Sequence, residues 1–245
     1  MMLQGKTAFV TGGSGALGAA MVRIFAREGC RVAFSFHSGQ ERAESLRQEL
    51  ADHGADMRAY PLDVLDTKAC QTLARTIEQD LGPVDILVNN AGFAQVLPFA
   101  MLEEDDWDRM LDVNVKGMLL VTKAFARGMI RRKRGSIVNV GSLAGVRMLE
   151  VPVHYATAKS AVVGFTISLA REFGRYNVRV NAIVPGMLTE GVAVNIPNKQ
   201  REEYTRFCAL SRPGEPAEAA ELAAFLASDR ASYINGQAIL VDGGI

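Results

Sequence analysis

Tyr155 and Lys159 stand four positions apart, directly before the segment Ser160–Ala170, whose apolar residues have helical spacing. On a helix, residues at i and i+4 lie on one face, so the phenol and the ammonium would be neighbours. A free phenol has a pKa of about 10, and a cation within ~4–6 Å lowers that pKa. Such a tyrosine can exchange a proton with an alcohol or a carbonyl oxygen. We therefore expect acid–base chemistry here; the alternative is an ordinary surface pair.

Two further polar side chains could take part in the same chemistry. Ser142 follows the apolar run Ser136–Val140, which we expect to be a strand, and its hydroxyl could donate to the substrate oxygen. Asn114 lies in the predicted helix Glu104–Lys116, between two valines. A polar side chain on an apolar helix face is costly unless it is hydrogen-bonded. We expect Asn114 either to have a structural partner or to hold a water molecule.

The start of the chain has the order of a nucleotide-binding unit. The apolar run Lys6–Val10 leads into the glycine-rich stretch Thr11–Gly18, and Ala19–Glu28 reads as a helix. Glycines in such a turn allow the backbone to approach a pyrophosphate, which then sits at the helix N-terminus. Many glycine-rich turns bind nothing, so the position of this one between a strand and the first helix carries the prediction.

The second predicted strand, Arg31–Phe36, bears on the choice of cofactor. In NAD-binding folds an acidic residue near the end of this strand bonds the ribose 2′-hydroxyl, whereas here no acid occurs before Glu41. His37 and Ser38 could donate to a 2′-phosphate, and Arg42 is in reach. The alternative is that these residues only cap the next helix, Glu41–His53. We predict NADP(H), with NAD(H) as the alternative.

The alternation of strands and helices continues to the end of the chain. It predicts an α/β fold, one doubly wound domain covering residues 1–245, with helices on both faces of a parallel sheet. The segment Met187–Leu210 has weak periodicity, and we expect it to be a lid (about residues 187–210). The other elements that we expect are strands at Met57–Leu62, Val84–Val88, Val178–Val184 and Gln237–Val241, and helices at Thr67–Asp80, Gly117–Arg134 and Glu218–Ala227.

Composition excludes several other classes of function. The 27 basic and 27 acidic residues give a net charge of zero, so nothing in the whole-chain charge indicates a nucleic acid or an anionic membrane as partner. We expect no metal site, because Cys30, Cys70 and Cys208 are scattered without a CxxC or Cys/His cluster. Reduced thiols, no signal peptide and no long apolar run predict a cytoplasmic protein.

Together these motifs resemble the short-chain dehydrogenase/reductase family. The resemblance implies a Rossmann-type fold with a seven-stranded parallel sheet, usually in a homotetramer. The matching residues run in the family's order through the whole chain: Thr11-Gly12 to Gly18, Asp63-Val64, Asn89-Asn90-Ala91-Gly92, Asn114, Ser142, Tyr155-x-x-x-Lys159 and Pro185-Gly186.

The resemblance also implies roles for individual residues. Asn114, Ser142, Tyr155 and Lys159 match the catalytic tetrad: Tyr155 would be the acid/base, Ser142 would hold the substrate oxygen, Lys159 would bind the nicotinamide ribose and lower the tyrosine pKa, and Asn114 would position a water. The expected cofactor contacts, besides His37, Ser38, Tyr155 and Lys159, are Gly12, Ser14, Gly15, Ala16, Leu17, Gly18, Asp63, Val64, Asn90, Ala91, Gly92, Ile183, Pro185, Gly186 and Thr189.

The sequence departs from the family pattern in two places. Ala16 replaces the middle glycine of the turn, and its methyl either crowds the pyrophosphate or shifts the turn towards Gly15. Thr189 lies one residue short of the usual threonine position, which Glu190 takes. The departure at Thr189 leaves open which side chain would bind the cofactor carboxamide.

Within the family, the stretches Ser211–Pro216, Phe225–Asp229, Tyr233–Gln237 and Val241–Gly244 look like the tail of 3-oxoacyl-acyl-carrier-protein reductases. The resemblance then implies NADPH-dependent reduction of a ketone, a 3-oxoacyl thioester, to a secondary alcohol. It implies docking of an acidic carrier at Lys133, Arg134 and Arg175, although cations also suit a helix C-terminus in their own right. The expected substrate pocket is apolar and contains Phe93, Ser142, Met148, Leu149, Val151, His154 and Met187.

Two other functions stay open at this point. One is an NAD(P)-dependent dehydrogenase of a free alcohol, sugar or ring substrate. The other is a non-catalytic cofactor-binding sensor or scaffold, since a fold does not fix a function. The Ser142, Tyr155 and Lys159 set argues against the second alternative, because a binder has no need of a tuned phenol.

Overall fold

A seven-stranded parallel sheet forms the centre of the computed structural model, which describes residues 1–52, 54–192 and 196–245. The strand order is β3-β2-β1-β4-β5-β6-β7, and neighbouring strands pair in parallel. The chain thus winds outward from β1 to β3 and then returns past β1 to build the other half. This confirms the predicted fold class. The strands are β1 Thr7–Val10, β2 Arg31–Phe36, β3 Met57–Pro61, β4 Ile86–Asn89, β5 Gly135–Val140, β6 Val178–Pro185 and β7 Ala238–Val241.

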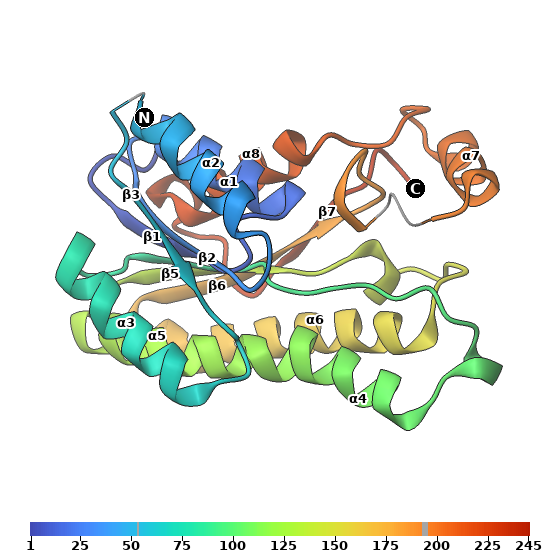
Figure 1. Ribbon diagram of the computed structural model, residues 1–245, viewed down its shortest axis with the longest axis horizontal. Coiled ribbons are helices and arrows are strands. Elements are labelled where there is room, and N and C mark those ends of the chain that lie inside the picture. The colour runs from blue at the N-terminus through green and yellow to red at the C-terminus, as the bar shows by residue number, and fades with distance from the viewer. Residues whose placement is uncertain (53, 193–195) are drawn as a thin grey trace.

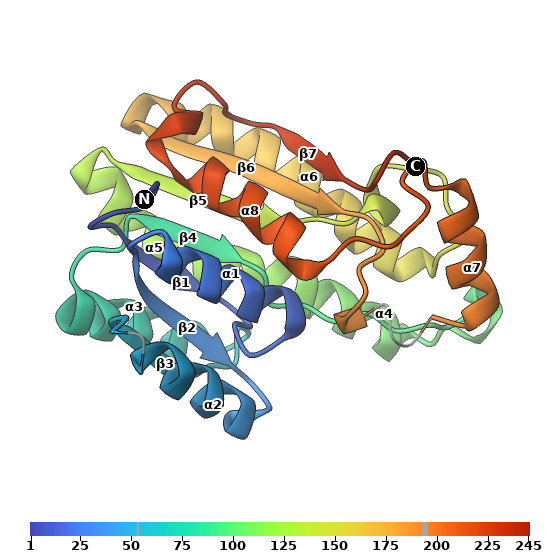
Figure 2. The ribbon, with the colours of Figure 1, turned by 90° about the horizontal axis from the view of Figure 1, so that it is seen from above.

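Helices cover both faces of the sheet, as Figures 1 and 2 show. One layer contains α1 (Ala16–Arg27), α2 (Gln40–Ala51) and α8 (Pro216–Ala227), with α1 packed against α8. The opposite layer contains α3 Thr67–Leu81, α4 Glu104–Leu111, α5 Gly117–Arg132 and α6 Val153–Phe173. The helix α7 (Asn198–Phe207) lies beyond the end of the sheet. Short 3-10 turns join these elements: η1 Phe99–Met101, η3 Leu143–Gly145, η4 Gly174–Tyr176 and η6 Asp229–Ala231.

The strands are apolar on both sides because both faces of the sheet are covered. Every residue of β1 and of β4 is buried. Phe34 belongs to the core under α1 and α2, whereas Phe9 stacks on Phe125 of α5 in the opposite core, with ring centroids 4.7 Å apart. The sheet is therefore a rigid platform whose strand ends hold the loops in fixed positions.

A buried polar network crosses the sheet next to the site described below. The Asn89 amide nitrogen donates to the Asn139 amide oxygen (2.8 Å) and to the Thr122 hydroxyl (2.9 Å). The Asn139 amide nitrogen in turn donates to the Thr166 hydroxyl (2.9 Å). These bonds connect β4, β5 and α6, so they fix the helix that carries Tyr155 relative to the strand that precedes Ser142.

The region 104–132 differs from the prediction of two ordinary helices. The helix α4 ends at Leu111, and a π-helical turn, η2 (Asp112–Lys116), leads without a break into α5. Apolar periodicity indicates helix but does not distinguish a wide turn from a regular one. The turn contains Asn114, so this departure lies at a predicted site residue.

Two more boundaries differ from those expected. The predicted irregular lid contains a helix, α7, which has no buried residues and follows Pro197. A polar helix of this kind has no apolar stripe, so hydrophobic periodicity could not reveal it. Residues 193–195 of that segment, and His53 at the end of the predicted helix 41–53, lie outside the described residues. None of the described helices combines the length and the apolar character that crossing a membrane requires.

The polar network predicts the effect of Thr166→Val on stability. Removing the hydroxyl leaves the buried Asn139 amide without its acceptor, which costs about 1–3 kcal/mol of unfolding free energy. Thr157→Val on the same helix is the matched control, because the Thr157 hydroxyl is exposed and bonds only the Val153 carbonyl. Urea denaturation of both variants measures the difference. Equal losses would contradict a role for the network.

Candidate active site

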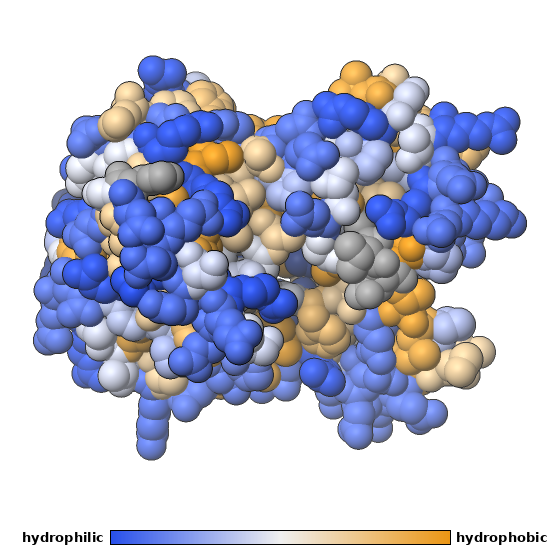
Figure 3. All heavy atoms as spheres, turned by 45° about the horizontal axis from the view of Figure 1, so that its top comes forward, coloured by the Kyte–Doolittle hydropathy of each residue, from blue (hydrophilic) through white to orange (hydrophobic). Residues whose placement is uncertain are grey.

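A cavity of about 330 Å³ opens at the carboxyl edge of the sheet. Figure 3 shows a hollow with apolar atoms on its walls near the centre of that view. Ligands bind at this edge in open α/β sheets, where the strand order reverses between β1 and β4. The walls come from the glycine-rich turn, the ends of β4, β5 and β6, the first turns of α6, and residues of the 187–210 segment.

The glycine-rich turn is packed tightly against the end of β4. The side-chain amide of Asn90 donates to the carbonyls of Thr11 (2.9 Å) and Gly12 (3.1 Å). The Thr11 hydroxyl accepts from the backbone amides of Asn90 and Ala91. Gly12 has a positive φ of 66°, and a Cβ on Gly18 would overlap the Gly12 carbonyl oxygen. The turn therefore leaves its backbone uncovered at the start of α1. This geometry fits a phosphate-bearing cofactor.

Ala16 does not distort this turn. It is the first residue of α1, and Gly15 is the N-cap. The Ala16 methyl lies 3.6 Å from the position that a Cβ on Gly191 would take, so it faces the 187–210 segment. Gly191 itself has a positive φ of 80°. The methyl group in place of the family's glycine thus meets the opposite wall at an ordinary contact distance.

Ser142 is held beside α6 by a close backbone approach. Its hydroxyl oxygen accepts from the Ala144 amide (3.2 Å) and caps η3. A Cβ on Gly145 would lie 2.5 Å from the Lys159 carbonyl carbon, and the Ser160 hydroxyl donates to the Gly145 carbonyl (2.9 Å). Only glycine allows the loop to dock this closely on the helix. This docking brings Ser142 next to Tyr155.

Lys159 is almost completely buried, with 7% of its surface exposed. Its ammonium donates to the Val140 carbonyl (3.1 Å) and lies 5.8 Å from the centre of the Tyr155 ring. Because burial penalises the charged form, the pKa of the Lys159 amine falls to about 8. The predicted i,i+4 neighbourhood of the two side chains is present, on a helix that begins at Val153.

The pKa of Tyr155 differs from the expectation. Burial raises the pKa of the Tyr155 phenol, and a hydrogen bond with Ser142 opposes this shift in part. The expected lowering of this pKa by the lysine is wrong for this structure, because the removal of the phenol from water is the dominant effect. Tyr155 therefore holds its proton firmly at neutral pH.

Asn114 has both a structural partner and an unpaired atom. Its amide nitrogen donates to the carbonyls of Met110 and Phe93, each at 3.1 Å. Its amide oxygen is buried without a partner. A Cβ on Gly92 would lie 2.5 Å from that oxygen and 3.7 Å from the Lys159 ammonium, so both polar groups flank Gly92. A buried acceptor next to a buried amine is the kind of atom that requires a donor.

The predicted cofactor residues divide into two groups. Those that line the cavity are Gly12, Gly15, Ala16, Leu17, Gly18, Asn90, Ala91, Gly92, Tyr155, Lys159, Pro185 and Gly186. Those that lie outside it are Ser14, His37, Ser38, Asp63, Val64, Ile183 and Thr189. Ile183 is completely buried in the sheet, and the Thr189 hydroxyl donates to Glu215 (2.8 Å). Asp63 accepts from the Leu65 amide (2.9 Å), and the Ser14 hydroxyl donates to the Ser38 carbonyl (3.4 Å).

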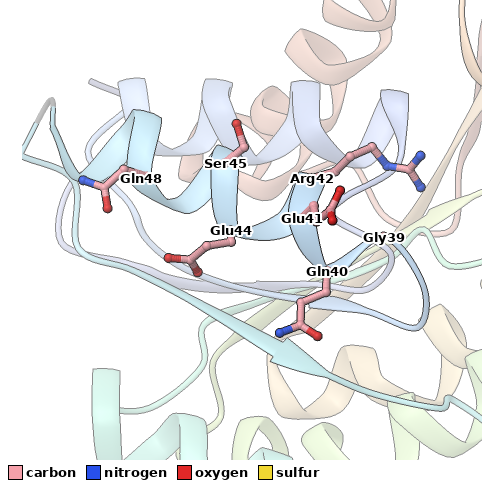
Figure 4. A pocket seen from close by; sticks show the side chains of 7 residues that line it. All are labelled: Gly39, Gln40, Glu41, Arg42, Glu44, Ser45 and Gln48. Atoms are coloured by element: carbon pink, nitrogen blue, oxygen red, sulfur yellow. The ribbon is translucent and has the colours of Figure 1, made fainter.

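A shallow hollow of about 1020 Å³ lies where β2 passes into α2. Figure 4 shows its lining side chains along the first turns of that helix. The Arg42 guanidinium folds back on Gly39, 2.6 Å from the position that a Cβ on Gly39 would take. Arg42 thus lies at the turn that follows β2, next to the predicted residues His37 and Ser38.

The predicted substrate residues are only partly correct. Phe93, Leu149, Val151 and Met187 line the cavity. Met148 is wrong, because its side chain is fully exposed while its neighbour Leu149 faces inward.

His154 is buried but lies outside the cavity, with Nε2 at 3.4 Å from the Gln95 amide oxygen. It precedes Tyr155 by one residue, and therefore points about 100° away around the helix.

Sequence reasoning missed several lining residues, among them Glu190, Val192, Ile196 and Tyr204. They all belong to the segment 187–210. The sequence carried little signal for them, because this segment lacks a regular apolar pattern.

The proposed docking residues lie at the opposite edge of the sheet. Lys133 and Arg134 directly precede β5, and Arg175 lies in η4 just before β6. They are therefore at the amino ends of these strands, whereas the cavity is at the carboxyl ends. Arg134 faces Asp85 at 3.7 Å, and Arg175 stacks on Tyr176 at 4.9 Å. The expectation that they border the entrance is wrong within one chain.

No group of histidine, cysteine and acidic residues within the described parts of the chain could hold a metal ion. The three cysteines are free and buried. Burial raises the pKa of Cys30 to about 12 and that of Cys70 to about 11, so these two thiols stay protonated.

Burial of Lys159 predicts a pH-dependent stability. Its pKa of about 8 in the folded protein lies below the unfolded value of 10.5, so the unfolded chain binds more protons between these pH values. Stability from this group therefore rises with pH in this window. We expect Lys159→Met to be more stable than the wild type at pH 7, with a difference that shrinks as the pH rises from 8 to 10.5. Urea unfolding across this range measures it. The exposed Lys123→Met is the control, and a constant difference for Lys159→Met would contradict the prediction.

Comparisons with known proteins agree with this geometry. A family model described as "Enoyl-(Acyl carrier protein) reductase" matches residues 13–245. The chain is 36% identical over 245 residues to the 3-oxoacyl-[acyl-carrier-protein] reductase FabG of Thermotoga maritima, covering 100% of this chain and 99% of the relative. It is 38% identical over 251 residues to the oxidoreductase UcpA of Salmonella typhimurium, covering 99% and 95%.

Solved structures of the same family also resemble the chain along its length. A short-chain dehydrogenase/reductase from Serratia marcescens superposes with a TM-score of 0.93 at 36% identity, covering 100% of this chain and 99% of that one. The sequence and the fold of the chain thus both match those of known relatives along its whole length. The chain belongs to the short-chain dehydrogenase/reductase family, whose oxidoreductases use a nicotinamide cofactor.

Proposed function

We propose that this protein reduces a ketone to a secondary alcohol with NADPH, and that its substrate is a 3-oxoacyl thioester. The observation that carries the proposal is the buried Lys159 amine beside Tyr155 and Ser142, in a cavity walled by a phosphate-binding turn. A cofactor binder without catalysis has no use for such an arrangement. The residues present fit a nicotinamide cofactor, because the uncovered turn and the cavity are continuous.

The bound cofactor would supply the hydride that reaches the carbonyl carbon. Ser142 orients the carbonyl oxygen by donating a hydrogen bond, and Tyr155 transfers its proton to that oxygen as negative charge develops there. The raised pKa of Tyr155 suits an acid, since the proton is present at neutral pH. Lys159 stabilises the tyrosinate that is left, because its charge becomes worth more in a site shielded from water. Asn114 holds a water molecule at its unpaired amide oxygen, and through this water Tyr155 regains its proton.

The turn after β2 supports a preference for NADPH. No carboxylate stands at the end of that strand to repel a 2′-phosphate, and the first acid, Glu41, lies on α2. The Arg42 guanidinium at Gly39 offers a planar set of donors that suits a phosphate. His37 and Ser38 are exposed beside it.

The apolar lining supports an acyl substrate. Phe93, Leu149, Val151 and Met187 present apolar surface to an acyl chain. The relative from Thermotoga maritima is named as a reductase of 3-oxoacyl groups on the acyl carrier protein. For a carrier-bound substrate, Lys133, Arg134 and Arg175 take part only if a second copy of the chain, as in the homotetramer that we propose, places its amino edge at the mouth of the cavity.

A free ketone or alcohol is the second candidate substrate. The observation that favours it is the absence of those three cations from the entrance of the cavity within one chain. A relative named only as an oxidoreductase is as similar as the named reductase. On this alternative, substrate would bind through the apolar walls alone.

The acid role of Tyr155 predicts the effect of Tyr155→Phe. The variant keeps the ring but has no proton to give, so we expect kcat to fall by two or more orders of magnitude. Its Kd for the cofactor should stay within about threefold of the wild type, because the lost hydroxyl acts on the substrate. Steady-state kinetics and cofactor fluorescence measure the two quantities. Substantial turnover by the variant would end the proposed mechanism.

The cofactor and substrate are tested together in one panel. Acetoacetyl thioesters, both carrier-bound and as a small mimic, and simple ketones are offered with NADPH and with NADH. We expect the highest kcat/KM for a thioester with NADPH, at least tenfold above NADH. A strong preference for NADH would refute the cofactor assignment. Equal rates on thioesters and simple ketones would favour the second candidate.

A further inference from the structure

Tyr204 is a cavity-lining residue of α7 that has no role in the chemistry described above. Its hydroxyl accepts from the Met187 amide (3.0 Å) and donates to the Asp242 carbonyl (3.2 Å). A Cβ on Gly186 would overlap this hydroxyl oxygen. The phenol therefore lies directly on the turn that ends β6, at the wall formed by Pro185, Gly186 and Met187.

The same hydroxyl joins this turn to the end of the chain, which Figures 1 and 2 both place beside α7. Behind Tyr204, the Leu210 amide donates to the Gly243 carbonyl (3.1 Å) and the Ala209 amide to the Gly244 carbonyl (3.4 Å). The buried Cys208 thiol donates to the Gly243 carbonyl (3.3 Å). Residues 208–210 and 242–244 thus form one packed unit.

The geometry does not support a role for Tyr204 as a second proton donor to the substrate. The Tyr204 hydroxyl already uses its proton on Asp242 and a lone pair on Met187. Burial also raises the pKa of this phenol. A group whose hydrogen-bonding capacity is taken up by the backbone positions that backbone.

The turn has other supports on its far side. The Gly214 amide donates to the Met187 carbonyl (3.0 Å), and the Thr189 amide to the Gly214 carbonyl (2.9 Å). The Met187 amide, however, has Tyr204 as its partner. Loss of the hydroxyl would leave this amide unpaired at the cavity wall without removing the other bonds.

We propose that Tyr204 is a positioning residue: its hydroxyl fixes the Pro185–Met187 wall of the cofactor cavity and couples that wall to the C-terminal residues 242–245. The inference rests on the proposed function only where it concerns cofactor affinity. The position of the wall is a property of the protein alone. The proposal assigns to the last residues of the chain an effect on a site to which they contribute no side chain.

Tyr204→Phe tests the proposal, because it removes a single oxygen and keeps the ring. In the cofactor-free protein we expect hydrogen exchange of the Met187 amide to become about tenfold faster, as loss of one hydrogen bond implies. We expect the Kd for NADPH, followed by its fluorescence, to rise about threefold to tenfold. Tyr233→Phe is the control, because Tyr233 is fully exposed. It should change neither quantity.

A chain that ends at Val241 is the second variant, because it also lacks the Asp242 carbonyl to which Tyr204 donates. It lacks the residues that pair with 208–210, so it should give the same increase in Kd and in exchange at Met187. Combined with Tyr204→Phe, the effects should be less than additive, because both changes disrupt one connection. Additive effects, or wild-type exchange at Met187 in Tyr204→Phe, would overturn the proposal.

The two hypotheses fail separately. If the wild type binds no nicotinamide cofactor, the proposed function fails, while exchange at Met187 still decides the role of Tyr204. If cofactor binds and Tyr204→Phe leaves both quantities unchanged, the positioning role fails and the function stands.

Discussion

The burial of one lysine amine is the constraint on which the whole site depends. Lys159 is withdrawn from water, and its ammonium donates to the carbonyl of Val140 at the end of β5. A charged amine in such a place is costly unless it is paired or hydrogen-bonded, and the Val140 carbonyl is its partner here. The loop after β5 is positioned by backbone contact: Gly145 lets it rest directly on the helix, which a side chain at that position would prevent. The same contact sets Ser142 opposite Tyr155, so one close approach arranges three functional groups.

The parallel sheet explains why residues far apart in the sequence meet. Each strand delivers its loop to the same edge, so the glycine-rich turn, the Asn90 segment, Ser142 and the Gly186 turn become neighbours. The amino ends of the same strands lie at the opposite edge of the sheet, and in β5 the two ends are separated by the six residues of the strand. The basic residues at the end of α5 lie at this amino edge. The topology therefore places these basic residues at the edge of the sheet opposite the cavity.

The sequence predicts the strands, the sheet and the clustering of Ser142, Tyr155 and Lys159 well. Apolar runs mark buried strands, and strand ends determine which loops meet. It predicts side-chain direction in loops poorly: Met148 and Leu149 are adjacent and both apolar, yet the first is fully exposed and the second lines the cavity. It also failed at Tyr155, where removal of the phenol from water raises the pKa that was expected to be lowered. The helix α7 escaped notice because most of its residues are polar, and its two aromatic residues, Tyr204 and Phe207, do not form a regular apolar stripe.

The wide turn at Asp112–Lys116 has a consequence for the geometry of α4 and α5. A π-helical turn holds one residue more than an α-helical turn, so it rotates everything that follows by about 100°. Without that extra residue, the apolar side of α5 that contains Phe125 would swing off the sheet, or α4 would leave its place beside α6. Asn114 sits where this phase change occurs. Deleting a single residue from the turn would thus change the rotational phase of the two helices relative to each other. It would displace the Asn114 amide even though Asn114 itself is unchanged.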